Sequence, residues 1–161
     1  MFLVKEIVTG GLWPLASMIG SYAVSNSISM VAVYAGLSFG LFSALGLPAL
    51  SDTFDEHEDA LFKVNSLSRA LSWRRKVQLL GVAVLILMTV TPLTYRSLGL
   101  NVVFPISVVV LSLVLLRWGV YPLVGGFEMQ TALRTRKLTY IYFLVVQAIM
   151  IFGTLNLNTL I

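Results

Sequence analysis

The groups best suited to chemistry are acidic residues gathered just after the first fifty positions. Five of the seven acidic residues of the chain lie in the stretch Asp52–Asp59, beside its single histidine, His57. Carboxylates at this density could hold a hard cation such as Mg²⁺ or Ca²⁺, with Asp55, Glu56 and Asp59 as weak candidate ligands. The spacing matches neither an EF-hand loop nor an H-E-x-x-H helix. A metal-dependent membrane enzyme that uses this acidic cluster is therefore the second alternative to the function derived at the end of this subsection. Apart from such a metal, no cofactor is expected.

The same stretch has a structural interpretation. Thr53 followed by Glu56 forms a capping box, which predicts that a helix begins there. Acidic residues lead this segment and basic residues close it, an order that complements the helix dipole. Apolar residues recur at helical spacing at Ala60, Val64, Leu67 and Leu71. We therefore expect an amphipathic helix at about 54–73 that lies on the cytoplasmic surface of a membrane.

Composition places the whole chain in the class of integral membrane proteins. Of its 161 residues, 58% are hydrophobic and 11% are charged, whereas about 25% of residues are charged in a typical soluble domain. The chain contains no cysteine, which excludes disulfides and thiolate metal sites. Its basic residues flank apolar stretches and form no broad patch, so no nucleic-acid partner is expected.

The apolar stretches predict an all-α, polytopic helical bundle that forms a single membrane domain over residues 1–161. A helix needs about 20 apolar residues to cross a bilayer core of roughly 30 Å. Five stretches of suitable length lie at about 6–24, 28–47, 77–95, 99–121 and 138–157. Five transmembrane helices are favoured. A bundle of four is the alternative, in which residues 1–24, interrupted by Gly10, Gly11 and Pro14, lie in the membrane interface.

The distribution of basic residues predicts the orientation. With the N-terminus and loops 51–76 and 126–137 on the cytoplasmic side, only Arg96 remains outside. The remaining basic residues are then cytoplasmic: Lys5, Lys63, Arg69, Arg74, Arg75, Lys76, Arg117, Arg134, Arg136 and Lys137. This is a strong positive-inside bias. We expect a multi-pass protein of a prokaryotic cytoplasmic membrane.

Aromatic and basic residues near the predicted span ends should anchor the helices at the interface. These residues are Trp73, Arg74, Arg75, Lys76, Arg117, Trp118 and Tyr121. Arg117 lies about one turn before Tyr121, so its long side chain can reach the cytoplasmic headgroups. Its alternative role is that of a residue on an ion pathway.

Small residues at four-residue spacing predict close helix packing. Membrane helices associate through such residues because the two backbones can approach one another. The residues are Ala16 and Gly20 in the first apolar stretch, and Ala32, Gly36, Gly40 and Ala44 in the second. Packing within one chain and packing between subunits are both consistent with this pattern.

The sequence contains no phosphate-binding glycine loop, nucleophile elbow or histidine pair. We therefore expect a non-catalytic membrane protein that serves as a structural or assembly subunit of a larger or oligomeric complex. Its partners would be the lipid bilayer and other membrane subunits, or further copies of itself. The first alternative is a small oligomeric channel or transporter, with Arg117 or Gln147 facing the conduit.

Overall fold

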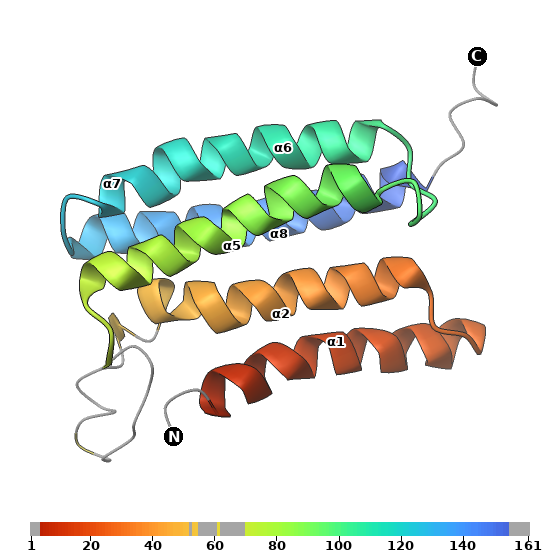
Figure 1. Ribbon diagram of the computed structural model, residues 1–161, viewed down its shortest axis with the longest axis horizontal. Coiled ribbons are helices and arrows are strands. Elements are labelled where there is room, and N and C mark those ends of the chain that lie inside the picture. Colours follow the sequence, from red (N-terminus) through yellow and green to blue (C-terminus); the bar gives the residue numbers. More distant parts are fainter. Residues whose placement is uncertain (1–3, 52, 55–60, 62–69, 155–161) are drawn as a thin grey trace.

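A computed structural model of the chain is helical throughout nearly all of the part that it describes, residues 4–51, 53–54, 61 and 70–154. The long helices run side by side along one axis (Figure 1). Within these residues there is no strand. The elements are α1 (Val4–Ser25), α2 (Met30–Leu50), α5 (Trp73–Thr94), α6 (Val103–Leu115), a π-helix (Leu116–Val120), α7 (Tyr121–Leu123) and α8 (Met129–Gly153).

Five of these segments are long and apolar enough to cross a membrane, which suggests a multi-pass membrane protein. They comprise Ile7–Ser25 of α1, all of α2, α5 and α8, and Val103–Leu123, in which α6, the π-helix and α7 are continuous. The prediction of an all-helical fold with five apolar helices is thus confirmed. The amphipathic helix predicted at 54–73 falls almost entirely outside the described residues. Leu71 and Ser72 are not helical, so the helical conformation is interrupted before α5 begins at Trp73.

Residues 25–27, which separate the first two predicted spans, form a tight turn between α1 and α2. Asn26 adopts a left-handed conformation with φ of 53°, which asparagine tolerates better than most residues. The Ser29 side chain then caps α2 by accepting a hydrogen bond from the Ala32 backbone N–H at 3.2 Å. The two helices therefore form an antiparallel hairpin.

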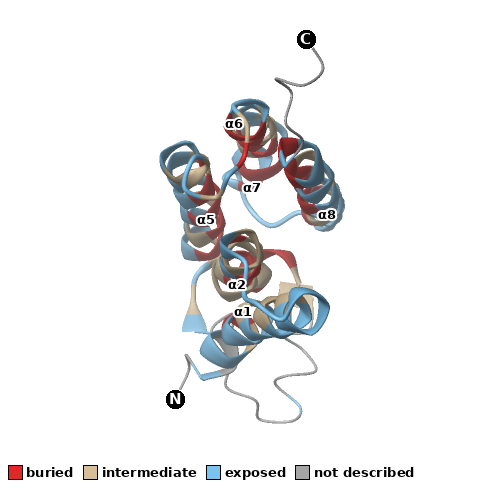
Figure 2. Ribbon diagram, turned by 90° about the vertical axis from the view of Figure 1, so that its right-hand side faces the viewer, coloured by how far each residue is buried: buried red, intermediate tan, exposed pale blue. Residues whose placement is uncertain are grey.

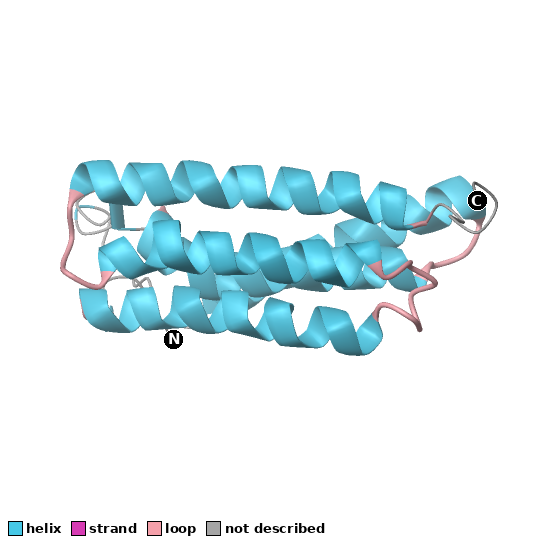
Figure 3. Ribbon diagram, turned by 90° about the horizontal axis from the view of Figure 1, so that it is seen from above, coloured by secondary structure: helices cyan, strands magenta, loops and turns pink. Residues whose placement is uncertain are grey.

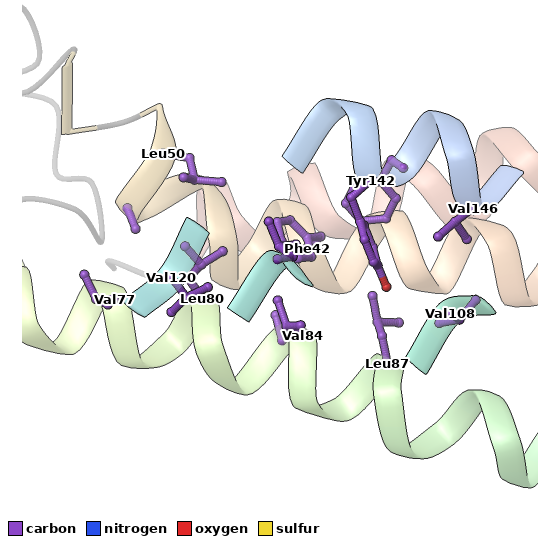
Figure 4. Packing of buried hydrophobic residues seen from close by; sticks show 14 of the residues in the cluster. Phe42, Leu50, Val77, Leu80, Val84, Leu87, Val108, Val120, Tyr142 and Val146 are labelled. Atoms are coloured by element: carbon purple, nitrogen blue, oxygen red, sulfur yellow. The ribbon is translucent and has the colours of Figure 1, made fainter. Parts of the chain in front are cut away.

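Helices α2, α5, α6 and α8 enclose one apolar core, and α1 lies outside it against α2 (Figure 2). Leu80 and Val84 of α5 and Phe104 of α6 are fully buried. Side chains from α2 and α8, including Phe42 and Tyr142, point into the same cluster (Figure 4). In α1, by contrast, Gly10 is the only buried residue among those whose burial is described.

Two pairs of buried hydroxyl groups link helices across this core. Tyr34 of α2 is hydrogen-bonded to Thr91 of α5, and Ser112 of α6 lies 3.0 Å from the hydroxyl of Tyr142 of α8. A buried hydroxyl without a partner is costly, so each pair favours one register between its two helices.

Helix α8 begins earlier than the sequence indicates. The predicted span starts at 138 and the segment 126–137 was expected to be a loop, but α8 starts at Met129. Tertiary contacts explain the extension, because Ala132 and Thr135 are buried against the end of the preceding span. The Thr135 hydroxyl lies within hydrogen-bond distance of two carbonyls, that of Gly119 in the π-helix at 3.0 Å and that of Thr131 in its own helix at 2.9 Å. The basic residues 134, 136 and 137 therefore belong to a helix.

The connections gather at the two ends of the bundle, which is elongated when seen from above (Figure 3). The start of α1, the end of α2, the start of α5 and the α7–α8 turn lie at one end (Figure 1). At this end the Trp73 indole N–H donates to the Leu123 carbonyl at 2.9 Å. At the other end, the Asn101 backbone N–H donates to the Gly153 carbonyl at 2.9 Å.

Candidate functional site

A cavity of about 330 Å³ lies where α1, α2 and α8 meet. We call it the lower cavity because it lies toward the end of the bundle that carries the basic residues. Its lining residues are Thr9 and Trp13 of α1, Phe39, Phe42, Ser43, Leu47 and Leu50 of α2, and Arg136, Thr139, Tyr140 and Phe143 of α8. Apolar side chains thus form most of the wall, and one arginine provides the positive charge.

A row of aromatic rings crosses the three helices and forms one wall of the lower cavity. Trp13 stacks on Phe39 with ring centroids 5.3 Å apart, and Phe39 stacks on Phe143 at 4.5 Å. Phe42 meets Phe143 edge to face at 4.8 Å. Beyond this row lies an upper cavity of about 230 Å³, which Trp13 and Phe39 also line, together with Ala16, Ser17, Ala35, Gly36 and Gln147. The two cavities therefore follow one groove between α1 and α8.

Backbone contact between α1 and α2 holds the floor of this groove. A Cβ atom placed on Gly36 would lie 2.6 Å from Pro14 Cα, and one placed on Gly10 would lie 2.9 Å from the Gly40 carbonyl oxygen. Ser17 adds a 2.6 Å hydrogen bond to the Ala32 carbonyl. Only glycine permits so close an approach of two helices.

The predicted packing residues divide into two groups. Gly36, Gly40 and Ala44 lie at the contact with α1, and their counterparts in α1 are Gly10 and Pro14, which the four-residue pattern did not include. Ala32 contributes its carbonyl group to the Ser17 bond. Ala16 and Gly20 are exposed, and a Cβ on Gly20 would meet no atom within 4 Å.

Two polar side chains of α8 distinguish the lower cavity from a simple packing defect. Thr139 is 4% exposed, and its hydroxyl has no hydrogen-bond partner among the described residues. Arg136 is half-buried, and its guanidinium lies over the Tyr140 ring, 5.8 Å from the centroid. Burying a hydroxyl without a hydrogen bond costs free energy, so such a group indicates an absent partner.

The sequence carried a signal for this site that its interpretation missed. Arg136, Thr139, Tyr140 and Phe143 stand at i, i+3, i+4 and i+7, which places them on one face of a helix. The basic residues were interpreted through topology alone, because residues 126–137 were expected to form a loop.

The predicted interface anchors lie at the end of the bundle where α5 begins. Arg74, Arg75, Arg117, Trp118 and Tyr121 are exposed. The Arg117 guanidinium lies 5.3 Å from the centroid of the Tyr121 ring, so the arginine points outward from the π-helix.

Two anchors make internal contacts. The Trp73 indole binds the Leu123 carbonyl. Lys76 was expected at the headgroups, but it is only 4% exposed, and its ammonium donates a 3.2 Å hydrogen bond to the Thr53 hydroxyl. That hydroxyl donates in turn to the Pro48 carbonyl at 2.7 Å. Lys76 therefore joins the end of α2 to the start of α5.

The candidate metal ligands Asp55, Glu56 and Asp59 lie outside the described residues, as does His57. Across the part of the chain that the structure describes, no group of three or more histidine, aspartate or glutamate side chains is arranged to hold a metal ion.

Comparisons with known proteins found no match for this chain. The chain matches no protein-family model, no curated protein and no solved structure. Its function must therefore be argued from its own residues.

Proposed function

We propose that this chain is a multi-pass membrane protein that acts as a non-catalytic structural or assembly subunit of a larger or oligomeric membrane complex. The observation that carries the proposal is the exposed position of α1. This helix packs on α2 through glycine, and large apolar side chains such as Ile7, Ile19 and Val24 remain more than 60% exposed. An apolar surface of this extent suits lipid or the helices of other subunits.

We further propose a prokaryotic cytoplasmic membrane, and the arrangement of the connections supports an orientation with the basic end of the bundle inside. Described basic residues of α5, α8 and the π-helix gather at the end where α5 and α8 begin (Figure 1). Arg96 lies at the opposite end, in the connection from α5 to α6. Positive-inside bias then places residues 51–76 and 126–137 in the cytoplasm.

Copurification in mild detergent tests the subunit role. We expect the tagged chain to retain a second subunit, or a second copy of itself, in a fixed ratio. Gly20→Leu should weaken this retention, because Gly20 is exposed and unobstructed within its own chain. Gly11 is equally open but lies nine residues away, about two and a half helical turns. Gly11→Leu is therefore the matched control, and a wild-type chain that runs as a lone monomer would contradict the proposal.

Single cysteines test the orientation, since the chain has none of its own. In intact cells, a membrane-impermeant maleimide should label Asn26→Cys and Ser97→Cys, which replace exposed residues of the two outer turns. Ser66→Cys and Gln130→Cys should react only after the membrane is opened. The opposite pattern would reverse the proposed topology.

The channel or transporter is supported by one observation. Gln147 is exposed on α8 and lines the upper cavity, where a polar side chain could face a conduit. The core between α2, α5, α6 and α8 is filled by buried apolar residues. A conduit would therefore have to run along the groove between copies of the chain, which makes this function secondary to the subunit role.

A further inference from the structure

We propose that the lower cavity binds one acyl chain of a membrane phospholipid with an anionic headgroup, and that Arg136 holds the phosphate. This inference rests on the proposed membrane placement, but it does not depend on the subunit role.

The lining suits a hydrocarbon chain. A volume of about 330 Å³ falls at the lower end of the range of roughly 300–1,000 Å³ for small-molecule pockets. The aromatic row of Trp13, Phe39 and Phe143 closes the side of the cavity that leads to the upper cavity. A partner helix is a poor occupant, because a helix with its side chains is about 10–12 Å across and would not fit this volume.

The polar groups lie at the correct end for a phospholipid. Arg136 is seven residues after Met129, the first residue of α8, and Phe143 is seven residues further along. At a rise of 1.5 Å per residue, the guanidinium level and the aromatic level differ by about 10 Å along the helix. With the basic end of the bundle at the cytoplasmic surface, Arg136 is then near the headgroups and Phe143 is among the acyl chains.

Both polar side chains lack the partner that a phospholipid would supply. Across the described residues no carboxylate pairs with Arg136. Its guanidinium lies over the Tyr140 ring instead. Within the same part of the chain the Thr139 hydroxyl has no hydrogen-bond partner, although it is buried. Arginine presents a planar array of donors that matches phosphate oxygens. Threonine in a helix has two accessible χ1 rotamers, so its hydroxyl can turn toward a phosphate or ester oxygen that enters the cavity.

Native mass spectrometry of the detergent-purified chain tests the proposal with two lipids of identical acyl chains, a phosphatidylglycerol and a phosphatidylcholine. We expect phosphatidylglycerol to bind about tenfold more tightly, because both lipids offer Arg136 a phosphate but the choline ammonium of phosphatidylcholine offsets the negative charge that Arg136 attracts. Arg136→Gln should abolish this preference, and Arg136→Lys should retain most of it. Excess inorganic phosphate should not displace the lipid, because the acyl chain provides much of the binding.

Arg134→Gln is the matched control. Arg134 is exposed and stands two residues before Arg136, which places it on another side of α8. A second variant, Ser43→Phe, fills the cavity from α2 and should weaken the binding of both lipids while the helical circular dichroism is unchanged. It keeps the test open if Arg136→Gln does not fold.

Equal affinity for the two lipids would overturn the proposal, as would equal losses in the Arg134 and Arg136 variants or displacement by inorganic phosphate. A second copy of the chain that blocks lipid binding would assign the cavity to a protein interface and overturn it as well. If lipid selectivity fails while copurification of a partner persists, the subunit role stands without this site.

Discussion

Gly40→Ala is expected to separate α1 from α2. A Cβ atom on Gly40 would overlap the carbonyl group of Gly10, and a backbone cannot move aside as a flexible side chain can. Overpacking of this kind costs about 1–3 kcal/mol. Since α1 packs principally on α2, the strain should appear as detachment of α1 and opening of the lower cavity. Unfolding by sodium dodecyl sulfate, followed by circular dichroism in mixed micelles, measures the loss of stability.

Trp13 reports whether the loss is local to α1. Its ring stacks on Phe39, so Gly40→Ala should change its emission in a Trp73→Phe, Trp118→Phe background. Gly20→Ala is the control, because the same added methyl group meets no atom within 4 Å. Equal effects of Gly20→Ala and Gly40→Ala would show that the α1–α2 backbone contact does not hold the hairpin together.

Thr91→Val is expected to destabilise the core more than Tyr34→Phe does. The Thr91 hydroxyl donates its only hydrogen to the Leu87 carbonyl at 2.6 Å, so it must accept the hydrogen bond of the Tyr34 hydroxyl. Valine leaves the Tyr34 O–H buried without an acceptor, which costs about 1–3 kcal/mol. Phenylalanine at position 34 leaves Thr91 still bonded to Leu87, so its cost should be smaller.

A double-mutant cycle on these two positions measures the coupling. The double variant Tyr34→Phe, Thr91→Val should be little less stable than Tyr34→Phe alone, because no polar group is then left without a partner. Additive losses of unfolding free energy would contradict the assigned donor and acceptor. Replacing Ser112 by alanine offers a comparison, since it removes the partner of Tyr142 in the other buried pair.

The lengths of the apolar stretches were sufficient to predict the helices. Five apolar stretches became five helices of membrane-spanning length, because apolar length is a local property of the chain. Membrane insertion, the orientation and the amphipathic helix at 54–73 stay predictions. The start of α8 at Met129 could not be predicted from hydropathy, because it depends on the contact of Thr135 with Gly119.

In the candidate site, too, patterns within one segment could be predicted and contacts between distant segments could not. The sequence pattern singled out Gly36 and Gly40, but the partners Gly10 and Pro14 emerged only from the way α1 crosses α2. Arg136 was predicted as a topological charge, whereas the cavity that it lines depends on three helices meeting. No periodicity within one segment reveals which faces of distant helices leave a space between them.

The sequence by itself therefore determined the all-helical fold with five apolar helices, since apolar length acts along the chain and requires no partner. The hairpin of α1 and α2 is also a local feature of the chain, because the four residues 26–29 between the two helices keep them close and antiparallel. Only the tertiary structure decided that α1 stands outside the core and that a cavity with one arginine lies beside it. Those features arise from side-chain packing between segments far apart in the sequence, and packing depends on shape in three dimensions.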